Sequence, residues 1–280
     1  MSAPDSAMVP PGTLPKAARN DLLEVRDVTV RFGGLVAVNR VSMAVKTGSI
    51  HGLIGPNGAG KTTLFNVMSG MVAPAGGGVT FAGRNTTNLP PFRLCELGIS
   101  RTFQNTRILG DMTVLENVQT GMHCRMRTRL WDAVLRTPVF REDERQTSAS
   151  SLELLEFTGL AGLRSEKARN LPYGLQRRLE IARALATGPR LLLLDEPGAG
   201  LNTGEKGDLQ DLIRSINKTL GKTIVLIEHD MKLAMSLCEE IMVLSQGDCI
   251  ATGPPAEIQR NPVVIEAYLG KGYRRSAAHA

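Results

Sequence analysis

One loop in the first quarter of the chain has the residue types and spacing needed to bind phosphate groups. Residues 55–62 fit the pattern G-x-x-x-x-G-K-[ST] without a mismatch. Glycines let the backbone wrap a phosphate chain with successive N–H groups facing its oxygens. Lys61 can reach the β- and γ-phosphates, and the Thr62 hydroxyl can bind Mg²⁺. The candidate phosphate contacts are Gly55, Pro56, Asn57, Gly58, Ala59, Gly60, Lys61, Thr62 and Thr63.

The segments on either side of this loop support the interpretation. Residues 49–54 predict a short buried strand, and residues 62–68 predict a helix. The mechanism needs this strand–loop–helix order, because the helix N-terminus adds the positive end of its dipole to the phosphate site. The alternative is a glycine-rich turn followed by a chance Lys-Thr pair. We therefore predict that the loop binds a nucleotide.

An acidic pair follows a second buried strand. Residues 191–194 are four leucines, as in a strand of a parallel sheet, and Asp195 and Glu196 come directly after them. A carboxylate at the end of such a strand can hold Mg²⁺, directly or through water. Its neighbour can polarise a water for attack on a γ-phosphate. The alternative is an ordinary acidic boundary between strand and loop. Together with the phosphate loop, the pair predicts phosphoryl-transfer chemistry.

Two further polar residues follow predicted strands. Gln104 comes after residues 99–103, and His229 comes after residues 224–228. Such residues are usually ordinary loop residues, but open α/β sheets bind ligands at the carboxyl ends of their strands. Gln104 and His229 are therefore candidates for sensing the γ-phosphate and its water.

The remaining pattern predicts an α/β fold with a mostly parallel sheet. A helical subdomain is expected at about residues 90–188, inserted in a single domain of residues 21–270. Residues 1–20 are rich in Pro, Ala and Ser and are expected to form a disordered extension, and residues 271–280 a flexible tail. Residues 76–78, three glycines, are expected to break the chain before a strand at 79–81. The other expected strands are at 22–32 and 38–45.

Composition argues against several functional classes. The chain has 280 residues, 42% of them hydrophobic and 21% charged, which is ordinary for a globular protein. Net charge is +6, but aromatic content is only 4% and no nucleic-acid module accompanies the charge, so no nucleic-acid partner is expected. The four cysteines lack C-x-x-C spacing, so we expect reduced thiols rather than zinc. No apolar run approaches the roughly 20 residues of a membrane helix.

The order of these features resembles the ATP-binding subunits of ABC transporters. The likeness covers about residues 21–270, nearly the whole chain. In chain order, the matching features are Phe32, the loop at 55–62, Gln104, a segment at 171–175 like the L-S-G-G-Q signature, Asp195 with Glu196, a short loop at 198–202, and His229.

A narrower resemblance is to the branched-chain amino acid importer subgroup. Residues 101–105 (R-T-F-Q-N), 172–183 and 227–231 (I-E-H-D-M) look like segments of that subgroup. The most telling segment is 261–270, N-P-V-V-I-E-A-Y-L-G, because general ABC ATPases do not end that way.

The resemblance implies a fold and a set of roles. The fold is a P-loop NTPase core with an antiparallel β subdomain and an inserted helical subdomain that docks on membrane subunits. The signature segment, here Pro172, Tyr173 and Gly174, binds the ATP of the opposite subunit in this family. The other implied roles are adenine stacking by Phe32, phosphate binding by Lys61 and the loop amides, Mg²⁺ contact by Thr62 and Gln104, metal support by Asp195, general base catalysis by Glu196 and γ-phosphate contact by His229.

The signature segment departs from the family pattern. Pro172 stands in place of Ser, which removes a hydroxyl and a backbone N–H. Leu175 replaces Gln, whereas Gly174 is kept. Asn202 stands where the family often has Asp. These changes place the strength of the contact with the partner's ATP in question.

The resemblance implies an ATP-hydrolysing subunit, with ATP and Mg²⁺, that powers a membrane importer for branched-chain or related amino acids. Its partners would be integral membrane permease subunits, a second ATPase subunit in a homo- or heterodimer and, indirectly, a periplasmic or extracellular binding protein. It would lie peripherally at the cytoplasmic face of the inner membrane. The alternatives are an ABC ATPase of a lipid or polysaccharide transporter, and a soluble ABC-type ATPase acting on nucleic acid or the ribosome.

Overall fold

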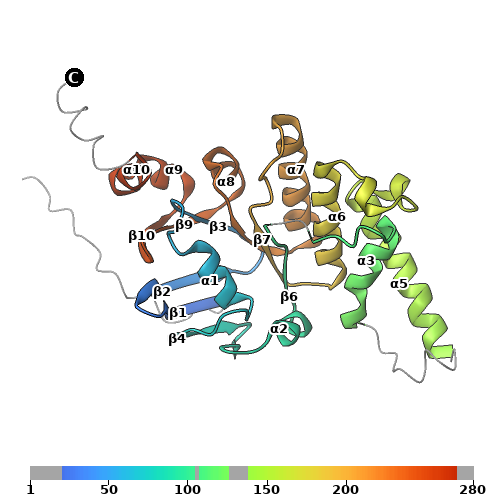
Figure 1. Cartoon of the computed structure of the whole chain (residues 1–280), viewed down its shortest axis with the longest axis horizontal. Helices are drawn as coiled ribbons and strands as arrows, with labels where there is room; N and C mark the ends of the chain where they lie inside the picture. Colours follow the sequence, from blue (N-terminus) through green and yellow to red (C-terminus); the bar gives the residue numbers. More distant parts are fainter. Residues whose placement is uncertain (1–20, 105–106, 126–137, 270–280) are drawn as a thin grey trace, which may run out of the picture.

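A six-stranded sheet forms the centre of the molecule (Figure 1). The computed structural model describes residues 21–104, 107–125 and 138–269, so the extension predicted at 1–20 and the tail predicted at 271–280 lie outside the described residues. Five strands run parallel and β10 pairs antiparallel with β9 at one edge. The strands, in their order across the sheet, are β10 (Asp248–Gly253), β9 (Glu240–Ser245), β3 (Ile50–Ile54), β8 (Thr223–Ile227), β7 (Leu191–Asp195) and β6 (Ile99–Arg101).

A second sheet of four antiparallel strands packs beside the first, in the order β2-β1-β4-β5. Its strands are β1 (Asp21–Phe32), β2 (Leu35–Lys46), β4 (Gly76–Phe81) and β5 (Arg84–Asn85). The predicted break at residues 76–78 is wrong, since these glycines begin β4 and pair with β1. The physical reason is close packing: a Cβ on Gly77 would lie 2.3 Å from the carbonyl oxygen of Arg26.

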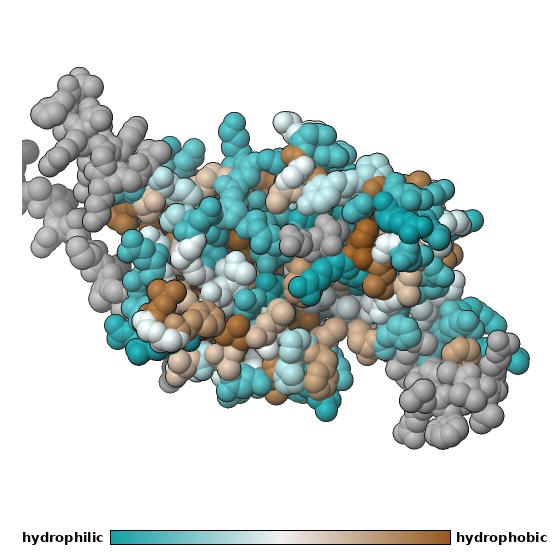
Figure 2. Space-filling model, in the orientation of Figure 1, coloured by the Kyte–Doolittle hydropathy of each residue, from teal (hydrophilic) through white to brown (hydrophobic). Residues whose placement is uncertain are grey.

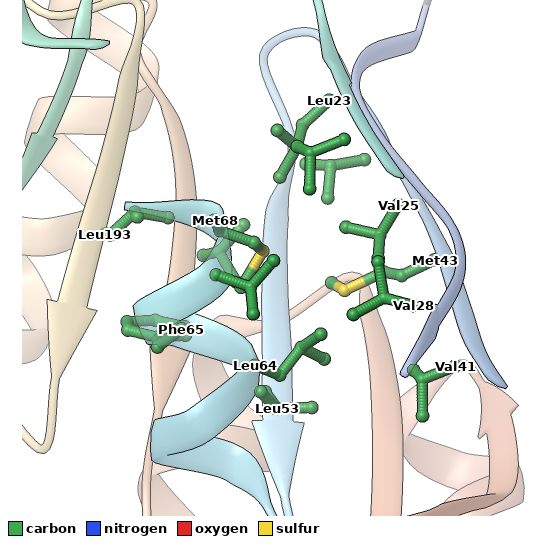
Figure 3. Close-up of a cluster of buried hydrophobic side chains, with 14 of the residues drawn as sticks. Leu23, Val25, Val28, Val41, Met43, Leu53, Leu64, Phe65, Met68 and Leu193 are labelled. Carbon is green, nitrogen blue, oxygen red and sulfur yellow. The ribbon is translucent and has the colours of Figure 1, made fainter. Parts of the chain in front are cut away.

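Helix α1 (Lys61–Met68) fills the space between the two sheets. Figure 3 shows Leu64 and Met68 among side chains of the antiparallel sheet, and Phe65 on the side of Leu193. All four of these side chains are 1% exposed or less. Burial of several such side chains supplies most of the stabilisation that fixes α1, and with it the loop that precedes α1.

The other face of the parallel sheet is covered by helices that follow β7, β8 and β10. A second buried cluster joins Ile224 and Leu226 of β8 to Leu209 and Ile213 of helix α7. No strand was predicted at residues 240–245 or 248–253, where the structure has β9 and β10. The helices on this side are α7 (Thr203–Leu220), α8 (Met231–Leu237), α9 (Pro255–Arg260) and α10 (Pro262–Leu269).

A third buried cluster joins the helices of the middle segment. Its main helices are α3 (Val114–Met122), α5 (Pro138–Phe157) and α6 (Tyr173–Ala186), with short 3-10 turns at His123–Arg125, Ala161–Leu163 and Ala168–Asn170. Helix α2 (Pro91–Leu97) and strand β6 precede them, and the pairing of β6 with β7 in the central sheet confirms the strand predicted before Gln104. Across the described residues, no helix is both long enough and apolar enough to cross a lipid bilayer.

The contact between α3 and α6 predicts a strong effect of a small substitution. A Cβ on Gly121 of α3 would lie 2.3 Å from the carbonyl oxygen of Arg183 on α6. We expect Gly121→Ala to lower the free energy of unfolding by about 1–3 kcal/mol, because the helices must move apart. Urea denaturation followed by circular dichroism measures the change.

Gly207 provides a matched control, since it also lies within a helix but an added Cβ there meets no atom within 4 Å. Gly207→Ala should be neutral or stabilising by up to about 1 kcal/mol. Equal effects of the two substitutions would contradict the close approach of α3 and α6.

Candidate active site

The candidate site lies where four parallel strands end. The phosphate loop follows β3, Gln104 follows β6, Asp195 ends β7, and His229 comes two residues after β8. Because β3, β8, β7 and β6 are neighbours in one sheet, their carboxyl ends meet along a single edge. The sheet therefore brings together polar residues that are far apart in the sequence.

The phosphate loop is held closely against the antiparallel sheet. A Cβ on Gly60 would lie 2.4 Å from the carbonyl oxygen of Ala37, and Gly60 has a φ of 98°, so only glycine fits there. The pocket beside the loop is lined by Phe32, Leu35, Val36, Ala37, Gly58, Ala59, Gly60, Lys61, Thr62, Thr63, Gln246 and Gly247. Figure 2 shows a hydrophobic patch over the β1–β2 hairpin, in which Phe32 and Leu35 are 52% and 66% exposed.

Lys61 is buried within this loop. Its Nζ donates hydrogen bonds to the carbonyl oxygens of Gly55 and Pro56, at 2.8 and 2.9 Å. Burial lowers the pKa of the Lys61 ammonium, and the nearby carboxylates of Glu196 and Asp195 oppose that shift. The lysine of the phosphate loop therefore lies within the electrostatic reach of the acidic pair.

Glu196 is held by the two polar residues predicted beside it. Its Oε2 accepts a hydrogen bond from Nε2 of Gln104 at 2.9 Å, and its Oε1 lies 2.6 Å from Nε2 of His229. The backbone of Glu196 is in the left-handed region, with φ 48°, and its N–H donates to Ile227 on the neighbouring strand. Such a conformation in a residue other than glycine is typical of functional sites. The carboxylate is thus fixed from both sides.

Asp195 is paired with a residue to which the sequence assigned no role. Nη2 of Arg101, in β6, lies 2.7 Å from Oδ2 of Asp195, and the two side chains are 8% and 3% exposed. Nη1 of Arg101 donates to Asn66 and Ser69 of the helix–turn region after the phosphate loop, at 2.7 and 2.8 Å. Arg101 therefore ties the acidic strand end to α1. An arginine within a buried strand was the one available signal.

The second carboxylate oxygen of Asp195 suits a cation. Its Oδ1 is buried and has no hydrogen-bond partner in the described structure. Mg²⁺ in nucleotide sites is commonly held by one or two carboxylates together with phosphate oxygens, rather than by a full set of protein ligands. The described residues contain no cluster of three or more His, Cys, Asp and Glu side chains that could hold a metal ion.

The signature-like segment lies apart from this pocket. Pro172 caps α6, which begins at Tyr173, and neither these residues nor Gly174 line the pocket of the phosphate loop. In Figure 1, α6 is on the far side of β7 from α1. A Cβ on Gly174 would lie 2.7 Å from Oε1 of Glu205, so this glycine packs closely on α7. The structure therefore brings the other candidates together without this segment.

Asn202 caps helix α7. Its side chain accepts a hydrogen bond from the N–H of Glu205 at 3.0 Å, and the Glu205 side chain accepts from the N–H of Asn202. This capping box stabilises the start of α7, so Asn202 has a structural role at the end of the loop after Glu196.

Comparison with known proteins identifies relatives along most of the chain. Residues 38–199 match the family model of the ABC transporter, and residues 249–274 match that of the branched-chain amino acid ATP-binding cassette transporter. The chain is 46% identical to the high-affinity branched-chain amino acid transport ATP-binding protein LivG of Salmonella typhimurium over 250 residues, 89% of this chain and 98% of that protein. It is 44% identical, with the same coverage, to BraF of Pseudomonas aeruginosa, which bears the same description.

A solved structure is similar along nearly its whole length. It is an ATP-binding cassette of an ABC transporter in its ADP conformation, with a TM-score of 0.78 and 32% identity. The similarity covers 90% of this chain and 99% of that structure.

The Arg101–Asp195 pair predicts a stability effect. We expect Arg101→Met to lower the free energy of unfolding by about 3–5 kcal/mol, because it leaves the buried Asp195 without its partner. The control is Arg169→Met, which breaks an exposed pair with Asp111 and should cost less than about 1 kcal/mol. Calorimetric or urea unfolding measures both; a similar small loss in both variants would contradict the buried pairing.

Proposed function

Because the chain belongs to the family of ABC transporter ATP-binding proteins, we propose that it binds ATP at the edge of the six-stranded sheet and hydrolyses it to drive import of branched-chain or related amino acids. The match of residues 249–274 to the branched-chain amino acid cassette family favours this substrate class over a lipid or polysaccharide. It equally favours a transporter over a soluble ATPase acting on nucleic acid or the ribosome.

The observation that carries the catalytic assignment is the position of Glu196. Glu196 is 8% exposed, its carboxylate is held by Gln104 and His229, and its charge opposes the lowering of the Lys61 pKa by burial. A general base for hydrolysis must be fixed near the γ-phosphate, which Lys61 and the loop amides are placed to bind. Glu196 meets that requirement.

In the proposed reaction, the oxygen of a water attacks the γ-phosphorus and the bond to the β,γ-bridging oxygen breaks. Glu196 accepts the proton of that water, so that phosphate leaves with ADP as the other product. Gln104 and His229 keep the Glu196 carboxylate in place during this step. Phe32, exposed at the mouth of the pocket, offers its ring to the adenine.

Mg²⁺, when bound with ATP, neutralises charge on the β- and γ-phosphate oxygens. We assign its contacts to Thr62, Gln104 and Asp195, with Oδ1 of Asp195 the atom free to face the ion or its water. Arg101 holds the opposite oxygen of the same carboxylate and so fixes which oxygen stays available.

We propose that Pro172, Tyr173 and Gly174 complete the ATP site of a second ATPase subunit. They begin a helix, where backbone N–H groups point outward, and Tyr173 is 43% exposed. The Pro172 substitution and the carboxylate of Glu205 beside Gly174 both weaken this surface as a phosphate contact. Two unequal ATP sites in a heterodimer would follow.

The remaining assignments concern the complex as a whole. We propose that residues 21–270 act as one ATPase domain whose helical part, built around α3, α5 and α6, docks on integral membrane permease subunits. The chain would then lie at the cytoplasmic face of the membrane. A periplasmic or extracellular binding protein would deliver the amino acid to the permease without touching this chain.

Glu196→Gln tests the assigned base. The amide keeps the shape of the carboxylate but cannot accept the water's proton, so the rate of ATP hydrolysis should fall by about 100-fold or more. Binding of a fluorescent ATP analogue should be retained. Glu153→Gln, an exposed change on α5, serves as the control with wild-type activity. Hydrolysis at the wild-type rate in Glu196→Gln would show that another group is the base.

Lys61→Ala tests the phosphate loop itself. Loss of a charged hydrogen bond to the phosphates should weaken ATP affinity roughly 10- to 100-fold. Equilibrium titration with a fluorescent nucleotide measures this directly, with Lys218→Ala, at an exposed position of α7, as the control. Unchanged affinity in Lys61→Ala would count against nucleotide binding at this loop.

A further inference from the structure

A buried ion pair on helix α6 is not used by the site described so far. Nη1 of Arg177 lies 3.1 Å from Oε2 of Glu180, one helical turn further along, and both side chains are 3% exposed. Burying two charges costs free energy, and such a pair is often no more stabilising than two apolar side chains of similar size. A purely structural explanation of the pair is therefore weak.

Both members of the pair hold the backbone next to Gln104. Nη1 of Arg177 donates to the carbonyl oxygen of Phe103 at 2.9 Å, and Nη2 donates to the carbonyl oxygen of Gln104. Oε1 of Glu180 accepts from the N–H of Phe103 at 3.1 Å. The two side chains thus bind three backbone groups of two successive residues. The loop that carries Gln104 is fixed by α6, not only by its own strand.

The same arginine contacts the start of its helix. The Arg177 guanidinium lies 5.3 Å from the centre of the Tyr173 ring, which itself packs against Gly200 in the loop after Glu196. Tyr173 belongs to the segment assigned above to the partner's ATP site. A displacement of that segment can therefore be transmitted to the backbone of Gln104 through the Arg177 side chain.

We propose that Arg177 and Glu180 are positioning residues that set Gln104 against Glu196 and make this contact depend on the place of α6. The proposal rests on the proposed function, because it gives Gln104 its effect through the Glu196 carboxylate. The chain of contacts runs from Tyr173 through Arg177 to the Gln104 backbone, and from the Gln104 side chain to Glu196. Arg177 acts on hydrolysis through Gln104 and touches neither nucleotide nor water.

The alternative is that the pair only stabilises the packing of α6 against the sheet. The two explanations differ in what a mutation changes. A pair with only a structural role affects the stability of the fold, and the effect of removing it adds to the effect of substituting any other residue. A positioning pair affects kcat through Gln104, so its loss has no further effect once the Gln104 side chain is gone.

The experiment is a double-mutant cycle on the full chain with Mg·ATP. Arg177→Lys keeps a positive charge but cannot donate to both carbonyl oxygens, and we expect it to lower kcat roughly ten- to a hundredfold with little change in KM for ATP. In the Gln104→Ala background, Arg177→Lys should lower kcat no further. The matched control is Arg178→Lys, on the next residue of α6; its partners are the exposed Asp208 and the carbonyl oxygen of Thr158, neither of which contacts Gln104, and its kcat should equal that of the wild type.

Glu180→Gln provides a second, nearly isosteric perturbation of the pair, and thermal unfolding monitors the fold of every variant. It should also lower kcat, and again only while Gln104 is present. Losses of kcat that multiply in the double variants, or a lower melting temperature with unchanged kcat, would overturn the positioning role and show that the pair has only a structural role. A wild-type chain that binds no ATP would instead overturn the proposed function, and the two failures are thereby distinguished.

Discussion

The parallel pairing of β3, β8, β7 and β6 is the constraint on which the site depends. Parallel neighbours in register must end at the same edge of the sheet, and each of these strands is followed there by a polar residue or loop. The core keeps the edges aligned, because β3, β7 and β8 are buried along their whole length and α1 is packed between the two sheets. The chemistry is therefore a consequence of strand order, and no single loop contains it.

Charges buried at this edge need partners, and the partners connect separate elements. Arg101 joins Asp195 to α1, and Arg177 with Glu180 joins α6 to the loop of Gln104. Glu228, whose pKa is raised by burial, accepts a hydrogen bond from the N–H of Gly198 at 2.7 Å and so links the end of β8 to the loop after Glu196. Each contact restricts how the loops around a nucleotide can move, which is what preorganisation for catalysis requires.

Local patterns predicted a large part of the fold, and long-range contacts account for what was missed. The four-leucine run predicted β7, and residues 62–68 predicted the helix that forms α1, because burial and periodicity can be recognised in consecutive residues. The glycines of β4 were misread, since their place in a strand depends on packing against β1. Local patterns could not show which residues pair with Asp195 and Gln104, because Arg101 and Arg177 lie 94 and 73 residues away from them in the chain. The roles of the site residues in hydrolysis stay predictions.

The central claim is that ATP and its metal ion bind at this one edge of the sheet, between Lys61 and the acidic pair. The most direct measurement is a crystal structure of the Glu196→Gln chain with ATP and Mn²⁺, in which anomalous scattering locates the metal. We expect an anomalous peak beside Thr62 and Asp195, with the γ-phosphate facing residue 196 and the adenine against Phe32. A metal peak remote from Asp195, or a γ-phosphate turned away from residue 196, would contradict it.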